Sequence, residues 1–129
     1  MTKKSELNHL RNKEKGDSRI KETKNFILEK TNGSLMNNQK WYRIFEWIEK
    51  CNAEFELKTI LSSEILKVKK LIELEKNSIL IDDSGCFIEF LELDKLILKS
   101  TVEIKIVLEK QNIEFLEKNN FIEINGYRK

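Results

Sequence analysis

The sequence predicts an α+β fold, with a mainly antiparallel sheet of about five strands and two helices packed on it. Three observations support this prediction. Apolar residues recur with a helical period after Asn37, residues 54–61 alternate charged and apolar side chains with the period of a strand, and glycine- or asparagine-containing turns separate short apolar runs. The 129 residues, 40% of them apolar and 36% charged, fit one domain with a modest core.

The chain divides into a predicted extension, residues 1–35, and a single α+β domain, residues 36–129. The first 30 residues carry nine basic and five acidic side chains, so the extension is basic. Its first 16 residues are expected to be disordered or fraying. Residues 18–31 favour a weak helix that ends at Asn32-Gly33, because glycine readily takes the left-handed conformation that follows many helices.

The strongest helical pattern begins at Asn37 or Asn38, either of which can cap a helix. An apolar stripe with helical spacing follows, and Cys51 or Asn52 closes it. The stripe consists of Trp41, Ile44, Phe45 and Ile48.

Residues 54–61 are predicted to form a strand with one face in water. Residues 64–75 fit both a helix and a strand, and we favour a strand. Residues 78–81 and 86–93 are predicted to pair as a hairpin around the turn at residues 82–85. The second of these strands is apolar on both faces for most of its length, which is typical of a central strand.

A second helix is predicted from Ser100, which can form a capping box with Glu103, to about Gln111. Residues 113–117 and 121–125 follow as a second hairpin. Asn119 and Asn120 favour its turn, because asparagine tolerates a positive φ.

The residue types of catalytic and metal sites are few. The only histidine, His9, lies in the extension, and Cys51 and Cys86 are too far apart in the sequence to resemble a zinc motif. Both cysteines are expected to be reduced and core-filling. The four glycines are scattered and form no phosphate-binding loop. We therefore expect no cofactor, no metal and no enzymatic activity.

Paired carboxylates are the one catalytic arrangement that the sequence leaves open. Asp82 with Asp83, or Glu89 with Glu92, would be the acid and base. The alternative interpretation is that these residues only solvate the surface, as most of the 22 acidic residues must.

The chain has no apolar block behind Lys3 and Lys4 and no uncharged stretch of the roughly 20 residues that a membrane-spanning helix needs. A cytoplasmic location without membrane contact is expected.

Protein binding is the function class that these observations favour. Tyr42 and Trp47 lie off the main helical stripe, so each forms either a second packing face or part of a partner surface. Acidic residues on the outward faces of the strands would attract a basic partner, the alternative being an ordinary solvated sheet face. The predicted partner-binding residues are Tyr42, Trp47, Glu54, Glu56, Glu89 and Glu92.

A nucleic-acid-associated accessory protein is the alternative function. It would use the basic extension together with Lys67, Lys69 and Lys70. Only one aromatic residue, Phe26, is interleaved with these basic residues, which makes the pattern a weak one for nucleic-acid binding.

Several short motifs resemble a group of small bacterial domains of unknown function. They are Asn-Asn-Gln-Lys-Trp at residues 37–41, Phe-Glu-Leu-Lys at 55–58, Ile-Glu-Phe-Leu-Glu-Leu at 88–93, Asn-Ile-Glu-Phe at 112–115 and Ile-Asn-Gly-Tyr-Arg at 124–128. That group is similar in size and build to the immunity proteins that neutralise bacterial toxins. The resemblance implies a cytoplasmic antitoxin-like factor whose partner is a basic toxin domain; the oligomeric state is left open.

Overall fold

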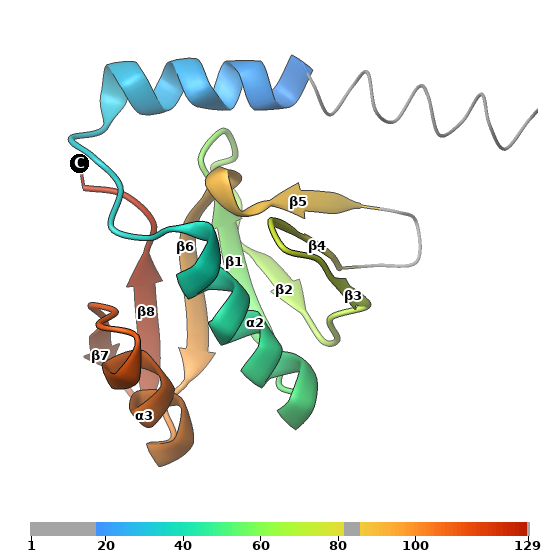
Figure 1. Ribbon diagram of the computed structural model, residues 1–129, viewed down its shortest axis with the longest axis vertical. Coiled ribbons are helices and arrows are strands. Elements are labelled where there is room, and N and C mark those ends of the chain that lie inside the picture. The colour runs from blue at the N-terminus through green and yellow to red at the C-terminus, as the bar shows by residue number, and fades with distance from the viewer. Residues whose placement is uncertain (1–17, 82–85, 129) are drawn as a thin grey trace, which may run out of the picture.

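A computed structural model describes residues 18–81 and 86–128 and has an α+β architecture with mainly antiparallel strands (Figure 1). Its helices are an N-terminal helix over residues 18–30, α2 (Asn38–Cys51), the short 3-10 helix η1 (Phe90–Glu92) and α3 (Val102–Lys110). Its strands are β1 (Phe55–Thr59), β2 (Leu66–Val68), β3 (Glu73–Leu74), β4 (Ser78–Leu80), β5 (Phe87–Glu89), β6 (Leu93–Lys99), β7 (Leu116–Lys118) and β8 (Phe121–Asn125). The predicted fold class is confirmed.

The strands form two sheets rather than the single sheet predicted. The larger sheet has the order β2-β1-β6-β8-β7, and the smaller sheet has the order β3-β4-β5. The chain leaves the larger sheet after Val68, and a tight β3–β4 turn, closed by the N–H of Glu75 donating to Ser78 O, starts the smaller one. The structure has three α-helices rather than the two predicted to pack on the sheet; the third, over residues 18–30, agrees with the helix predicted for residues 18–31 of the extension.

Helix α2 forms as its sequence pattern predicts. The side chain of Asn37 accepts a hydrogen bond from the N–H of Lys40 at 2.8 Å, and Asn52 ends the helix in the left-handed conformation with φ 52°. All four residues of the predicted stripe are buried. Cys51, predicted to fill the core, is exposed, because it is the last residue of α2 and lies beyond the buried part of the stripe, which ends at Ile48.

The core lies between α2, α3 and one face of the larger sheet (Figure 1). Phe45 of α2 stacks on Phe90 with ring centroids 5.6 Å apart, and its other contacts are an edge-to-face contact with Phe55 and a tilted one with Trp41. The sheet contributes alternate residues, as the two-residue period of a strand requires. These are Phe55, Leu57, Leu96, Leu98, Ile122 and Ile124.

The predicted strand over residues 86–93 is interrupted, and the central strand is instead β6, which the sequence pattern did not reveal. Strand β5 ends at Glu89, because the Glu92 side chain accepts the Glu89 N–H at 2.8 Å and turns the chain into η1. This turn brings Phe90 into the core. The chain then re-enters a sheet at Leu93, between β1 and β8.

The remaining sequence predictions are largely confirmed. Residues 64–75 hold strands, and β4 pairs with β5, although the intervening residues 82–85 lie outside the described part of the chain. Strands β7 and β8 form the second hairpin, with φ values of 52° at Asn119 and 67° at Asn120. Helix α3 is capped by Thr101 instead of Ser100, because Thr101 accepts the N–H of Ile104.

The segment that follows the N-terminal helix runs beside the C-terminal residues. The N–H of Asn32 donates to Arg128 O, the N–H of Leu35 donates to Gly126 O, and the N–H of Gly126 donates to Asp94 O. Gly126 is therefore hydrogen-bonded on both sides, and it is also packed tightly against β6. A Cβ atom at this position would lie 2.2 Å from the backbone oxygen of Leu93.

Gly126→Ala should lower the free energy of unfolding by about 3 kcal/mol, because the added methyl group meets backbone rather than a side chain that can move aside. Urea unfolding followed by circular dichroism measures the loss. Asn125→Ala is the matched control, since Asn125 is only half-buried and should change stability by less than about 0.5 kcal/mol. Equal stabilities of the two variants would contradict the packing argument.

Tyr127 ties the C-terminal segment to η1, because its hydroxyl donates to Leu91 O at 2.6 Å. Burial, followed by the charge of Asp94, raises the pKa of Tyr127 above its ordinary value of 10.0. The folded chain therefore favours the neutral phenol. Its contribution to stability is complete below about pH 10 and is lost as the pH rises through the raised pKa.

Tyr127→Phe should cost about 1 kcal/mol near pH 8, where the hydroxyl donates its hydrogen bond. The difference in unfolding free energy between the two proteins should shrink above about pH 10, because only the tyrosine protein loses stability there by ionising at this position. Paired urea titrations at each pH cancel the contributions of the lysines. A difference that stays constant from about pH 8 to pH 11 would contradict this assignment.

Candidate functional site

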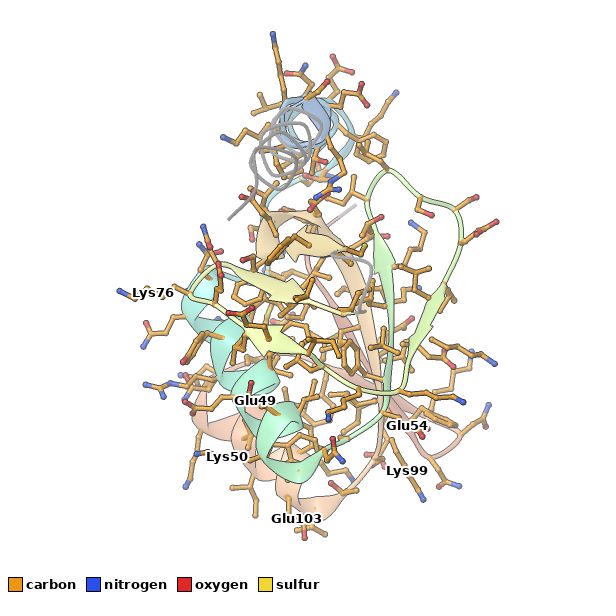
Figure 2. The ribbon with its side chains drawn as sticks, turned by 90° about the vertical axis from the view of Figure 1, so that its right-hand side faces the viewer. Glu49, Lys50, Glu54, Lys76, Lys99 and Glu103 are labelled. Atoms are coloured by element: carbon orange, nitrogen blue, oxygen red, sulfur yellow. The ribbon has the colours of Figure 1, made fainter. Side chains whose placement is uncertain are left out.

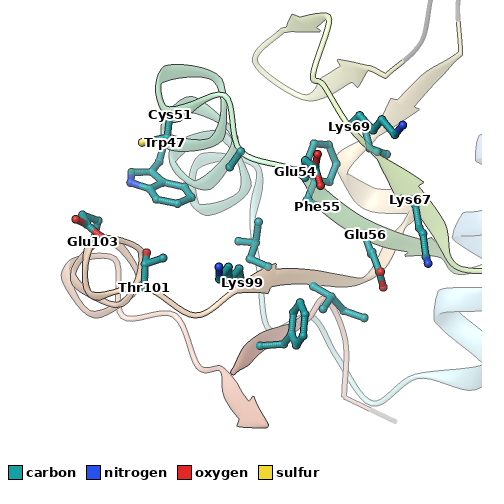
Figure 3. A pocket seen from close by; sticks show the side chains of 15 residues that line it. Trp47, Cys51, Glu54, Phe55, Glu56, Lys67, Lys69, Lys99, Thr101 and Glu103 are labelled. Atoms are coloured by element: carbon teal, nitrogen blue, oxygen red, sulfur yellow. The ribbon is translucent and has the colours of Figure 1, made fainter. Parts of the chain in front are cut away.

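A groove of about 820 Å³ lies at the end of the larger sheet, where α2 ends, β1 begins, β6 ends and α3 begins (Figure 3). Trp47 and Cys51 of α2 line one side, and Thr101 and Glu103 line another. The sheet supplies apolar lining from four strands, β1, β2, β6 and β8. These residues are Phe55, Val68, Ile97, Leu98 and Phe121.

Charged side chains of both signs surround the apolar lining. Three glutamates and three lysines line the groove, namely Glu54, Glu56, Glu103, Lys67, Lys69 and Lys99. None of the five ion pairs found among the described residues includes any of these six. Glu56 and Lys67 are direct cross-strand neighbours, and Figure 2 shows Glu54 and Lys99 at the same end of the sheet. The charged side chains of the groove are thus available to pair with groups of a bound molecule.

The groove continues onto the face of the larger sheet opposite α2 and α3. We call this surface the open sheet face. Burial alternates along its strands: Leu96 and Leu98 are buried, whereas Ile97 is half-buried and Lys99 is exposed. From the register of the strands, the open sheet face consists of Glu56, Lys58, Lys67, Lys95, Ile97, Lys99, Leu116, Lys118, Phe121, Glu123 and Asn125.

Apolar side chains are exposed on this face. Phe121 is 50% exposed and Leu116 is 58% exposed. Phe121 lies directly opposite Lys99 on one side and Lys118 on the other. An exposed aromatic ring between charged groups is typical of the residues that anchor protein interfaces.

Two ion pairs organise the open sheet face. Lys95 Nζ lies 2.7 Å from Glu123 Oε1, with both side chains about one-third exposed. Lys58 Nζ lies 3.1 Å from Asp94 Oδ2, and the Asp94 side chain is almost fully buried. These pairs hold the side chains of three strands in fixed positions.

The structure brings three of the six predicted partner-binding residues together. Trp47, Glu54 and Glu56 all line the groove. Tyr42 is half-buried on α2, packs against the core and does not line the groove.

Glu89 and Glu92 were predicted on outward strand faces, and this placement is wrong for Glu92, which is 3% exposed. The two residues form the capping box of η1, and Arg19 of the N-terminal helix reaches Glu92. Arg19 Nε lies 2.5 Å from Glu92 Oε1, and its Nη2 donates to Phe87 O at 2.8 Å. The Glu-x-x-Glu spacing was the available signal for a cap.

The sequence did not identify Ile97, Lys99 or Phe121 as surface residues. Ile97 and Lys99 belong to β6, which was not predicted, so their side could not be assigned. Phe121 was placed in a hairpin strand, and alternation along Phe121–Asn125 with buried Ile122 and Ile124 was the signal that could have put it on the outer face.

Three residues that were considered for catalysis or metal binding lie outside the described part of the chain. They are His9 and the carboxylate pair Asp82 and Asp83. Within residues 18–81 and 86–128, no three histidine, cysteine, aspartate or glutamate side chains lie close enough together to hold a metal ion. None of the helices in these same ranges is long and apolar enough to span a membrane.

No protein-family model, curated protein or solved structure matches this chain. The resemblance to toxin-immunity proteins therefore stays a prediction from short motifs.

Arg19→Met should lower the free energy of unfolding by about 1–2 kcal/mol, because it leaves the buried carboxylate of Glu92 without its cation. The expected loss is smaller than for a fully buried pair, since the Arg19 side chain is 43% exposed and partly screened by water. Urea unfolding measures the loss, and hydrogen exchange should show faster exchange over residues 18–30.

Arg43→Met is the matched control for this ion pair. Arg43 is similarly exposed, at 45%, but its partner Glu46 is also partly exposed, so its removal should cost less than about 0.5 kcal/mol. Equal losses of stability in the two variants would show that the burial of Glu92 does not strengthen its ion pair with Arg19.

Proposed function

We propose that this chain is a non-catalytic protein-binding factor that acts by covering a surface of another protein, in the manner of a toxin-immunity protein. The observation that supports this most directly is the groove, whose apolar lining and unpaired charges adjoin an exposed aromatic residue on the open sheet face. Such a combination of an apolar centre and a charged rim is typical of protein interfaces.

Trp47 is the proposed anchor of the contact. It lies on the side of the groove formed by α2, and it is only half-buried in the free chain (Figure 3). Tryptophan contributes large binding energies when a partner removes its remaining surface from water. The apolar lining below it, which includes Phe55 and Leu98, can receive an apolar side chain of the partner.

The charges around the groove specify the chemistry of the partner surface. Glu54, Glu56 and Glu103 would receive basic side chains, whereas Lys69 and Lys99 would receive acidic ones. A basic toxin domain is the proposed partner, because residues 31–129 carry 15 basic and 17 acidic side chains and are therefore slightly acidic. Long-range attraction between such proteins would speed their encounter.

Co-expression with the product of the adjacent gene tests the proposal. That product should be toxic when expressed alone, should lose its toxicity in the presence of this chain, and should co-purify with it. Trp47→Ala should weaken the complex by about 30-fold or more, as measured by calorimetry, because an anchor of this type typically contributes at least about 2 kcal/mol.

Tyr42→Ala is the matched control, since Tyr42 is another half-buried aromatic residue of α2 but does not line the groove. It should bind within a few-fold of the unmodified chain. Glu54→Lys provides a second groove variant on an exposed side chain, so that a folding defect of Trp47→Ala cannot be mistaken for lost binding. A non-toxic adjacent product that does not bind would overturn the proposal. Nucleic-acid binding that falls steeply with salt and disappears when residues 1–30 are deleted would favour the alternative function.

A further inference from the structure

The open sheet face carries an ordered charge pattern centred on Ile97 of β6. The residues directly opposite Ile97 are Glu56 on β1 and Glu123 on β8, so a carboxylate lies on each side of it across the sheet. Lys95 and Lys99 lie two residues before and after it along β6 and share its face. Two glutamates and two lysines therefore form the arms of a cross, with an apolar residue at the centre.

Phe121 lies diagonally beside Ile97 on the same face. It is opposite Lys99 on the adjacent strand, whereas Ile97 is opposite Glu123. The line from Ile97 to Phe121 thus runs diagonally, between the direction across the sheet to Glu123 and the direction along β6 to Lys99. Neighbouring strands are about 4.8 Å apart, and residues two apart along a strand are separated by about 6.8 Å. The distance from Ile97 to the glutamates across the sheet and its distance to the lysines along β6 therefore differ by only about 2 Å, a mismatch that the long glutamate and lysine side chains can bridge.

We infer that the open sheet face binds the same face of a second copy of this chain, with the two β6 strands crossing at nearly a right angle. The two-fold axis of this pair lies in the interface along the line from Ile97 to Phe121. Rotation about that axis exchanges the direction along the strands with the direction across the sheet. Glu56 of each copy then meets Lys95 of the other, and Glu123 meets Lys99.

The same rotation brings the apolar residues together. Ile97 contacts Ile97 of the second copy, and Phe121 contacts its own counterpart, so the apolar side chains lie at the centre with four pairs of opposite charges around them. Near-perpendicular crossing is one of the two usual ways in which sheets pack face to face. The Lys95–Glu123 pair, 2.7 Å apart within one copy, already holds two of these groups in position.

In the inferred arrangement Lys58, which is paired with Asp94 in each copy, also lies on the axis and faces its own counterpart. Symmetric arrangements with the axis along or across the strands bring more like charges together. With the two-fold axis along the strands, Glu56 would face Glu123 and Lys95 would face Lys95. With the axis across the strands, Glu56 would face Glu56 and Lys95 would face Lys99. Like charges placed directly opposite one another are destabilising. The second diagonal axis satisfies the charges but places Phe121 against Lys58, so it buries less apolar surface.

The size of the face predicts a weak and reversible dimer. Five strands span about 24 Å, and the seven residues of β6 span about 23 Å, which gives roughly 500 Å² per copy. Stable complexes usually bury about 800 Å² per partner. Measurements therefore need to extend to about 1 mM chain.

This inference goes beyond the proposed function and does not rest on it. Five residues belong both to the groove and to the open sheet face, so a second copy would cover this part of the groove. They are Glu56, Lys67, Ile97, Lys99 and Phe121. If the proposed function is also correct, partner binding and self-association compete, and saturating partner should convert the dimer to a complex with one copy of this chain.

Sedimentation velocity of the full chain measures self-association directly. The unmodified chain, of 15.4 kDa, should sediment as a monomer at about 1 μM and approach twice that mass as its concentration nears 1 mM. Two charge-reversed variants then test the geometry. Glu56→Lys with Glu123→Lys gives only positive charges in the four contacts, and Lys95→Glu with Lys99→Glu gives only negative ones.

Each variant alone should remain a monomer, whereas an equimolar mixture should form a heterodimer, because every contact between the two variants joins opposite charges. Rescue by mixing is a result that a folding defect cannot produce. Two control variants, Glu22→Lys with Glu49→Lys and Lys50→Glu with Lys76→Glu, change the net charge by the same amounts at exposed positions outside this face. Figure 2 shows Glu49, Lys50 and Lys76. Both variants should still dimerise.

A monomer throughout the concentration range would overturn the inference. So would a dimer that both charge-reversed variants retain, since the contact would then lie on another surface. Failure of the two variants to associate when mixed would overturn the perpendicular arrangement. None of these results depends on whether the adjacent gene encodes a toxin.

Discussion

Phe45 of α2 lies between Phe90 and Phe55, and this aromatic contact joins the main parts of the fold. Phe55 belongs to the larger sheet, while Phe90 lies in η1, where the chain passes from the smaller sheet to the larger one. The contact therefore fixes α2 on one sheet and positions the junction between both. Burial of three large rings also provides much of the apolar area that a domain of this size can remove from water.

The junction at η1 determines where several polar groups lie. Because Phe90 turns into the core, Glu92 follows it inward, where it accepts the N–H of Glu89 and pairs with Arg19. Glu92, which the strand pattern placed on the surface, thus attaches the N-terminal helix through Arg19. The same turn aligns β6 between β1 and β8, so that Ile97 and its charged neighbours lie on the open sheet face.

The spacing of apolar residues within each helix or strand could be predicted, but the segments against which that element packs could not. The stripe of α2, the alternation of β1 and the asparagine turn before β8 depend on local spacing and conformational preference, and all three form as predicted. The prediction of one continuous strand over residues 86–93 was wrong, because Glu92 accepts the backbone N–H of Glu89 and pairs with Arg19, which is 73 residues away in the sequence. No local pattern contains that partner.

The sequence alone determined that the chain is α+β and where α2 begins and ends, and it predicted Trp47, Glu54 and Glu56 as partner-binding residues. Those properties follow from side-chain period, capping and charge, which act over a few residues. The tertiary structure alone decided that these three residues share one groove with Lys69, Lys99 and Phe121, and that Ile97 lies between two glutamates and two lysines. Both arrangements depend on strand order and register, which arise from pairing between segments distant in the sequence.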